Sequence, residues 1–436
     1  MSDAPHTRAV ERTAVTAGPS RRGPGGRRRT EPFHAAITGI GMITAAGPDT
    51  ARTWEAVVHG RPTTAVIPEL AGMPVQLACQ ASAFDGDAVL GRRAAWRLDR
   101  CTQMALVAGR EAVADAGLDP AQWDAARVGT VLGSALGGIG TWQREYDRLR
   151  ELGPERISPM TIPMSLPNLI AGQMATDLQA CGPSLVTSTA CASGTTALGV
   201  ARDLLRHDSC DIVITGGAES SLVHSVVAAF ARAGALSRNT ADLGRASRPF
   251  DVDRDGFVIA EAAAILVLER PDHARARGAQ IYAYVSGYGA SADAGHETRP
   301  DPEGAGAQRA VEAALRDAEL FPIEIDHVNA HGTSTPLNDL AEGRMVRRVI
   351  GGHPLVTAAK GVTGHSLGAA GAVEAALTAL TLKHQVVPPT AGLREMDPAV
   401  DLDVVRGTAR EQTVEAALSN SFGFGGQNAA LVLTRA

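Results

Sequence analysis

Buried strands and amphipathic helices alternate along the chain from residue 34 onward. The segment HAAITGIGMITAAG (34–47) is an apolar run ending in a glycine-rich turn, which is typical of a buried strand. The pattern after it predicts helices at 99–117, 166–180 and 192–207, and strands at 127–133, 184–188, 211–217 and 262–269.

A second series of the same kind begins at residue 281. IYAYVSGYGASAD (281–293) repeats the strand and glycine turn of the first segment, and the echo suggests a duplication. Helices are predicted at 307–320 and 366–384, with strands at 327–331, 355–360, 415–421 and 428–434. This alternation predicts an α/β architecture with helices covering the sheets, divided into halves at 34–280 and 281–436.

Residues 1–33 differ from this body in composition. They include GPSRRGPGGRRR and lack apolar periodicity, which predicts a disordered basic arm. Residues 1–34 hold seven Arg against three acidic residues, a balance of +4. The whole chain has a net charge of −6, so the remainder sums to −10, which does not favour a nucleic-acid partner. An RNA or membrane role for the arm is the less favoured alternative to a solvated tail.

The composition also limits the compartment and the covalent chemistry. No apolar run among the 436 residues approaches the roughly 20 that span a membrane, and no signal peptide opens the chain, so we expect a soluble, cytoplasmic protein. The cysteines are odd in number and have no CxxC spacing: Cys79, Cys101, Cys181, Cys191 and Cys210. A disulfide framework or a structural zinc site is therefore not expected, and a free thiol is available for chemistry.

Cys191 is the candidate nucleophile. It lies in VTSTACASGTTALGVARDLL, between a β-branched strand and an amphipathic helix. The positive end of the helix dipole and the unpaired N–H groups there favour a thiolate over a thiol. A buried structural cysteine is the competing interpretation.

Two histidines, His331 and His365, lie in Gly/Ser/Thr-rich turns at predicted strand ends, where active sites of α/β folds gather. Metal binding would be a rival use, but the sequence shows no HxxxH spacing and no third clear ligand, so we expect no metal. Lys360 precedes His365 by five residues and is one of only two lysines among 41 basic residues, which suggests a site that rejects guanidinium. Glu374 is its plausible partner charge.

The segment NSFGFGGQN at 420–428 is the last candidate. Its glycines around Phe422 and Phe424 allow the backbone to approach a ligand closely. A flexible hairpin loop is the alternative reading.

Together, TACASG, NAHGTSTPLND, KGVTGHSLGAAG and NSFGFGGQN resemble the β-ketoacyl-acyl-carrier-protein synthases, in particular the elongating synthase I/II group. The resemblance runs from about residue 34 to the C-terminus. It implies a thiolase-like αβαβα five-layer sandwich of two similar halves. It also implies decarboxylative Claisen condensation of an enzyme-bound acyl group with malonyl-acyl-carrier protein, giving 3-oxoacyl-acyl-carrier protein and CO2. The segment AEAAA at 260–264 looks more like ketosynthase subunits of type II polyketide systems, so both fatty-acid and polyketide elongation stay open.

The resemblance also assigns roles to the polar residues. Cys191 would accept the acyl group. His331 and His365 would assist loss of CO2 and stabilise the enolate. Lys360, paired with Glu374, would order the site.

Further roles concern substrate binding. The backbone N–H groups of Cys191 and Phe424 would form the oxyanion hole, and the Phe424 ring would be the gate. Thr333 and Thr335 would hold the pantetheine arm, and Leu136 would border the acyl pocket. No resident cofactor is expected, because the phosphopantetheine arrives on the acyl-carrier protein.

The implied partners are an acyl-carrier protein and a second subunit, which makes either a homodimer or a heterodimer with a chain-length-factor-like protein. Two alternatives remain. A non-catalytic chain-length-factor-like subunit would lack the nucleophile, whereas this chain has Cys191. A thiolase would need a second cysteine near the C-terminal glycine loop, but no cysteine follows Cys210.

Overall fold

A 13-stranded mixed sheet runs through residues 32–436, the part of the chain that the computed structural model describes. The main strand order is β12-β10-β9-β14-β15-β8-β1-β7-β6-β4-β5. The first-half strands are β1 (Ala35–Thr44), β4 (Val128–Gly133), β5 (Ser184–Thr187), β6 (Ile212–Ser220) and β7 (Ile259–Glu269). The second-half strands are β8 (Ala283–Ala292), β9 (His327–Asn329), β10 (Leu355–Thr357), β12 (Asp403–Val404), β14 (Ala416–Gly423) and β15 (Gln427–Arg435). The predicted arm at 1–33 lies outside the described residues except for Pro32 and Phe33.

The two halves of the sheet meet between β1 and β8. This antiparallel pairing is short and joins Ala35–Ile37 to Ala283–Val285. The short strands β2 (Ala65–Val66) and β3 (Leu77–Cys79) attach to β7, and β11 (Val386–Val387) pairs with β13 (Arg410–Glu411) separately.

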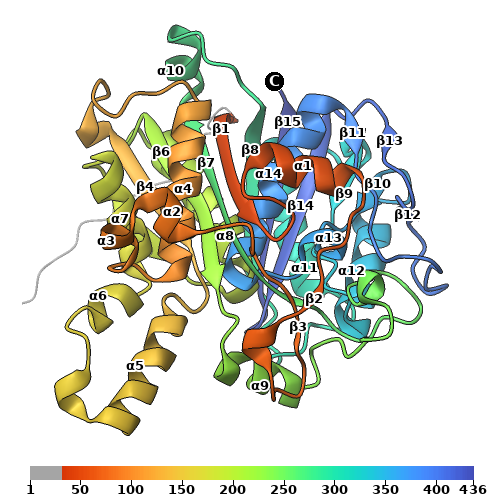
Figure 1. Ribbon diagram of the computed structural model, residues 1–436. Helices are drawn as coiled ribbons and strands as arrows, with labels where there is room; N and C mark the ends of the chain where they lie inside the picture. The colour runs from red at the N-terminus through yellow and green to blue at the C-terminus, as the bar shows by residue number, and fades with distance from the viewer. Residues whose placement is uncertain (1–31) are drawn as a thin grey trace, which may run out of the picture. The chain divides into compact units, whose positions relative to one another are not determined.

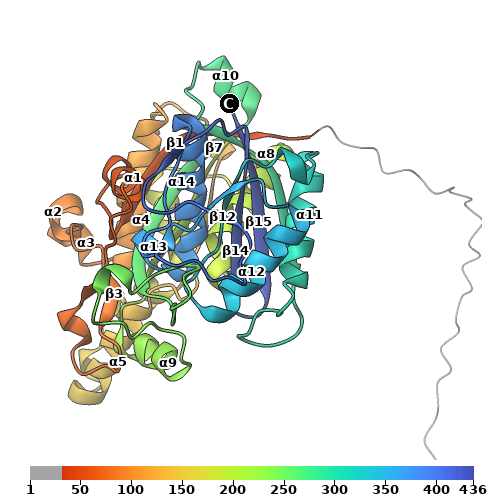
Figure 2. The same cartoon turned by 90° about the vertical axis from the view of Figure 1, so that its right-hand side faces the viewer.

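Helices cover both outer faces and fill the space between the two halves of the sheet. On one outside, α4 (Arg100–Asp115) packs on β1, β6 and β7, and α7 (Asn168–Leu178) packs on β4 and β5. On the other outside, α11 (Ala305–Ala318) packs on β8 and β15, with α12 (Pro336–Val349) beside it. Between the two halves of the sheet, α8 (Ser193–Arg206) and α14 (Ala370–His384) contact strands of both halves. Figures 1 and 2 show α4 and α11 on opposite sides, so the predicted five-layer αβαβα fold is confirmed.

The echo between ITGIG and VSGYG has a packing cause. A Cβ at Gly41 of β1 would lie 1.9 Å from the Ala108 carbonyl oxygen of α4, and a Cβ at Gly289 of β8 would lie 2.0 Å from the Ala310 oxygen of α11. Only glycine permits an outer helix to approach a strand this closely. A glycine therefore allows an outer helix to approach a strand closely in both halves.

The remaining helices are short or polar: α1 (Thr50–Val58), α2 (Gly86–Leu90), α3 (Arg92–Ala95), α5 (Ile139–Leu152), α6 (Thr161–Ser165), α9 (His224–Arg232), α10 (Pro271–Ala276) and α13 (Lys360–Thr363). Several predicted boundaries were wrong. The strands expected at 327–331 and 355–360 end at Asn329 and Thr357, and Lys360 begins α13 instead. The helix expected at 366–384 begins at Ala370.

Candidate active site

Cys191 lies in the turn that joins β5 to α8, where the sequence predicted it. The preceding residue, Ala190, has a positive φ of 48°, which is a strained conformation for a residue with a side chain. Ser193 fastens this turn, since its hydroxyl accepts the Thr189 N–H at 2.9 Å and donates to the Ala190 carbonyl at 2.7 Å. The backbone of Gly423 packs against it, because a Cβ there would lie 3.2 Å from the Cys191 nitrogen. The thiol is thus held in one orientation, only 8% exposed.

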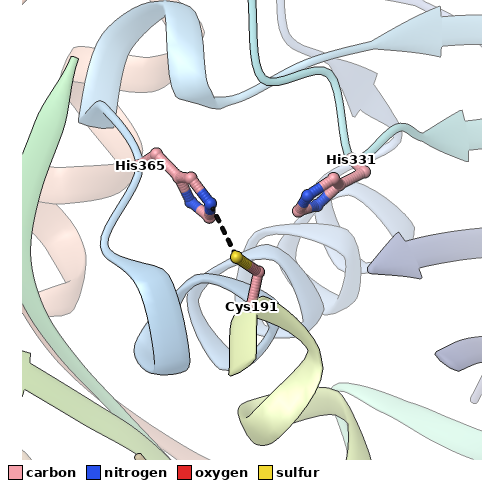
Figure 3. Close-up of side chains that lie close together, drawn as sticks. All are labelled: Cys191, His331 and His365. Atoms are coloured by element: carbon pink, nitrogen blue, oxygen red, sulfur yellow. Dashed lines mark hydrogen bonds between the residues drawn. The ribbon is translucent and has the colours of Figure 1, made fainter. Parts of the chain in front are cut away.

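His365 contacts the sulfur directly. Its Nε2 lies 3.1 Å from Cys191 Sγ, as Figure 3 shows. The His365 N–H donates to the Val258 carbonyl at 2.8 Å, and the Ala260 N–H donates to the His365 carbonyl at 3.0 Å. Two backbone hydrogen bonds to the start of β7 therefore fix the residue that meets the thiol.

His331 approaches the same sulfur from the end of β9. Its ring centroid lies 5.4 Å from that of His365, with the ring planes nearly perpendicular. One ligand-type atom from each of Cys191, His331 and His365 lies within 4.8 Å of the others, and both rings flank the thiol in Figure 3. The carboxylate of Glu342 on α12 accepts the His331 and Gly332 N–H groups, each at 2.8 Å, and so holds the turn.

Lys360 and Glu374 form a buried ion pair behind His331. The ammonium contacts the Glu374 carboxylate, and their side chains are 1% and 2% exposed. Lys360 Nζ also donates to the His331 carbonyl at 2.7 Å and lies 3.3 Å from His331 Nδ1. Because an ammonium can only donate, Nδ1 must be the acceptor, and the proton of His331 is on Nε2.

The site is uncharged around the sulfur. Burial raises the pKa of the Cys191 thiol to about 11, although the Lys360 charge opposes this shift. Burial, reinforced by the Lys360 charge, holds the pKa values of His331 and His365 well below the usual range. The expectation of a resting thiolate is therefore wrong, because the loss of hydration outweighs the favourable charges. The groups in contact at neutral pH are a thiol and a neutral imidazole.

Phe424 presents its backbone to the thiol. Its N–H donates to the Cys191 sulfur, while its side chain is 37% exposed and its ring centroid lies 6.0 Å from that of Phe230. Gly425 and Gly426 follow with φ of 84° and 67°, so the glycine-rich segment is an ordered turn between β14 and β15. The structure therefore places the Phe424 N–H, which the resemblance assigns to the oxyanion hole, next to the Cys191 sulfur.

A cavity of about 710 Å³ opens onto these groups. Its lining includes the predicted residues Leu136, Thr333 and Thr335, and the two threonine hydroxyls lie 2.9 Å apart. The lining also includes aromatic and polar residues that the sequence did not single out: Phe230, Phe257, Arg299, Asn338 and Asn428. The buried carboxylate of Glu342 was missed as well, because the polar helix α12 was not predicted.

The structure groups three possible metal ligands that the sequence did not bring together. One ligand-type atom from each of Cys191, His331 and His365 lies within 4.8 Å of the others. The expectation that no metal is bound therefore stays a prediction. A cation held by these atoms would add charge near the buried Lys360 ammonium, and the thiol would have to lose a proton whose pKa is about 11.

Fold and site together define a thiolase-like condensing enzyme with a Cys-His-His site. Profiles described as "Beta-ketoacyl synthase, N-terminal domain" and "Beta-ketoacyl synthase, C-terminal domain" match residues 34–274 and 282–394. The 3-oxoacyl-[acyl-carrier-protein] synthase 2 of Staphylococcus aureus (strain COL) is 42% identical over 404 residues, which is 92% of this chain and 97% of that protein. The chain therefore belongs to the beta-ketoacyl synthase family of acyltransferases.

Solved ketosynthases have the same fold. A beta-ketoacyl synthase from Burkholderia phymatum STM815 superposes with a TM-score of 0.87 at 34% identity, over 93% of this chain and all of that one. A type II polyketide ketosynthase in complex with its acyl-carrier protein gives 0.86 at 29% identity, with the same coverage. No helix within residues 32–436 is both long and apolar enough to cross a membrane.

Proposed function

We propose that Cys191 carries the growing acyl chain and that this protein condenses it with malonyl-acyl-carrier protein, releasing CO2. The observation that carries this proposal is the 3.1 Å contact between Cys191 Sγ and His365 Nε2 inside the cavity. The proposed reaction has two halves, which use the same sulfur in different states. Fatty-acid and polyketide elongation share this chemistry.

In the first half, the acyl group moves from a carrier-protein thioester to Cys191. Because burial keeps the thiol protonated, its proton passes to His365 Nε2 as sulfur attacks the carbonyl carbon. The same proton then leaves with the carrier-protein thiol, so the half-reaction is balanced. The N–H groups of Cys191 and Phe424 would bind the oxyanion, each contributing about 3–4 kcal/mol of transition-state stabilisation.

In the second half, malonyl-carrier protein loses CO2 and the resulting enolate carbon attacks the Cys191 thioester. His331 donates from Nε2 to the developing enolate oxygen, because Lys360 occupies its Nδ1. Acylation frees Nε2 of His365 from the thiol, so that both rings face the incoming thioester. Collapse of the tetrahedral intermediate releases the Cys191 sulfur, which takes up one proton to restore the thiol.

The carrier protein delivers the reacting groups, so the reaction requires no resident cofactor. Thr333 and Thr335 line the cavity and would hydrogen-bond the pantetheine arm, and Leu136 would contact the acyl chain. A structural relative was solved with its acyl-carrier protein, and another is a ketosynthase in complex with its chain length factor, at a TM-score of 0.79 and 26% identity. These likenesses support both kinds of partner for this chain.

The edge strand β5 and the adjoining helices offer a place for a second subunit. β5 ends the sheet, and large apolar side chains are exposed on α5 and α6: Trp142, Tyr146, Leu149, Leu152 and Ile162. Figure 1 shows α5 projecting from the body beside α6. Burying this surface in a dimer would shield both the strand edge and the apolar residues. Light scattering of the purified chain, alone and with neighbouring gene products, distinguishes a homodimer from a heterodimer.

Acyl-enzyme mass spectrometry tests the proposed function. Incubation with acyl-carrier-protein thioesters should add the acyl mass at Cys191, and malonyl-carrier protein should then release CO2. Cys191→Ala should abolish the adduct. Absence of both products from the unmodified protein would favour a non-catalytic chain-length-factor-like subunit.

A further inference from the structure

A buried carboxylate that takes no part in the proposed chemistry lies below the acyl pocket. Glu219 on β6 is 0% exposed, and within residues 32–436 it forms no ion pair with a basic side chain. Its two carboxylate oxygens instead accept hydrogen bonds from uncharged donors. One oxygen accepts the Ala135 N–H at 2.7 Å and lies 3.4 Å from the Leu136 nitrogen, and the other accepts the Ser221 hydroxyl at 3.1 Å.

The same carboxylate also reaches the segment that follows His365. The Gly368 N–H donates to Glu219. A Cβ at Gly368 would lie 2.7 Å from the carboxylate oxygen and 2.3 Å from the Ala135 nitrogen, so nothing else fits between the two segments. Glu219 is therefore the side chain through which the 134–137 loop and the 365–369 segment meet.

Both segments contribute directly to the site. Ala135 and Leu136 from the first, and Leu367 from the second, line the cavity. Leu367 has a φ of 45°, a strained conformation that the surrounding contacts must maintain. His365 is two residues earlier and contacts the thiol at 3.1 Å.

We propose that Glu219 is a positioning residue whose carboxylate fixes the acyl-pocket wall at Leu136 and the alignment of His365 through one set of hydrogen bonds. An ionised carboxylate can do this because it is purely an acceptor, and the Ala135, Gly368 and Ser221 groups facing it are donors. Burial raises the pKa of Glu219 to about 7, so the acylation experiment is run at about pH 8, where the ionised form dominates. An amide of the same size would present an N–H to one of these donors. The wall and the imidazole would then no longer be held together. This inference rests on the proposed acylation of Cys191.

The consequence is a coupling between acyl-chain length and thiol reactivity. A displaced Leu136 wall affects long chains more than an acetyl group, whereas a displaced His365 affects every chain. A misplacement of roughly 1 Å costs up to about 100-fold in rate. Glu219→Gln should therefore slow acetyl transfer to Cys191 by about tenfold and decanoyl transfer by about 100-fold, lowering the decanoyl-to-acetyl rate ratio about tenfold.

The experiment measures single-turnover acylation of Cys191 in the full chain by mass spectrometry, with acetyl- and decanoyl-carrier protein as probes. Glu145→Gln is the matched control. Glu145 is also a buried carboxylate that accepts a backbone N–H, from Ser158 at 3.0 Å. It pairs with Arg148 at 2.9 Å and lies on α5, none of whose residues lines the cavity. Glu219→Asp is the second variant, because it keeps the charge but is too short to reach both segments. Thermal unfolding establishes that each variant is folded.

A lowered ratio in a folded Glu219 variant, with a wild-type ratio in Glu145→Gln, supports the proposal. A wild-type ratio in either folded Glu219 variant overturns it, as does an equal change in the control. Failure of the unmodified protein to load Cys191 is a different result. It would contradict the proposed function itself and this inference with it.

Discussion

Lys360 contributes to stability through its ion pair with Glu374 and to the active site through its contact with His331. Substitutions at Lys360 and Glu374 can separate these two contributions. Lys360 and Glu374 are 1% and 2% exposed, so Lys360→Met would leave a buried carboxylate without its cation. Breaking a buried pair in this way costs about 3–5 kcal/mol. For a chain of this length the unfolding entropy is roughly 0.9 kcal/mol per kelvin, so the melting temperature should fall by about 3–6 °C.

The double variant Lys360→Met/Glu374→Met tests whether that loss comes from the unpaired charge. Replacing both members of a buried pair with apolar residues is often neutral, so the double variant should melt close to the unmodified protein. It should nevertheless remain unable to release CO2, because His331 Nδ1 has lost its donor. Lys383→Met, at the exposed second lysine, is the control and should change neither property. A double variant that is both stable and active would refute the positioning of His331 by Lys360.

The loss in Lys360→Met should also depend on pH. Burial raises the pKa of Glu374, and the Lys360 charge opposes that shift, so removing the lysine raises this pKa further. A carboxyl with a raised folded-state pKa stabilises the fold below its unfolded pKa, and that stability is lost as pH rises through the folded value. The melting deficit should therefore be larger at about pH 9 than at about pH 5. A deficit that is independent of pH would show that Glu374 is not left charged.

Three further predictions concern the cavity. Above roughly pH 7, the rate at which iodoacetamide alkylates Cys191 should still rise about tenfold per pH unit, because the thiol pKa is about 11. Exposed Cys181 is the reference thiol, and a rate for Cys191 that levels off near pH 8 would contradict this prediction. His365→Ala should slow acylation of Cys191, whereas His331→Ala should spare acylation and abolish CO2 release; equal effects on both steps would contradict the separate roles. Leu136→Trp should lower decanoyl loading while sparing acetyl loading, measured by mass spectrometry, and an unchanged ratio would place the acyl chain elsewhere.

Local sequence patterns predicted the strands and helices that carry the site better than they predicted its electrostatics. The strand-to-helix turn at Cys191 follows from the apolar periodicity of α8 and the small residues before it, whereas α14 follows from a continuous run of apolar and small residues that is buried on all sides. Both are local signals. The charge state of the thiol depends instead on how completely distant segments exclude water from it. The dipole argument for a thiolate considered only the residues next to Cys191, whereas the lost hydration is produced by the surrounding fold.

The sequence also did not predict the contacts that hold the two histidines in place. Glu342 lies on helix α12, which was not predicted, and its carboxylate reaches the His331 N–H only after α12 packs beside the turn that follows β9. Glu219 lies two residues beyond the strand predicted at 211–217, and donors to its carboxylate come from segments 84 and about 150 residues away. A single sequence carries no signal for such pairings, because they depend on the relative placement of the two sheets. Lys360 was identified by its rarity, not by its surroundings.

The neutral state of the two imidazoles suits the second half-reaction better than a charged one would. An imidazolium beside the enolate would be a strong enough acid to protonate the carbanion, and malonyl thioester would then be wasted as an acetyl thioester. Burial and the Lys360 charge hold the pKa values of His331 and His365 well below the usual range, so each ring is uncharged when the enolate forms. A neutral N–H still donates a hydrogen bond to the oxygen without giving up its proton. The burial that makes Cys191 a poor thiolate therefore also protects the carbon nucleophile, so that the same buried groups suit both steps.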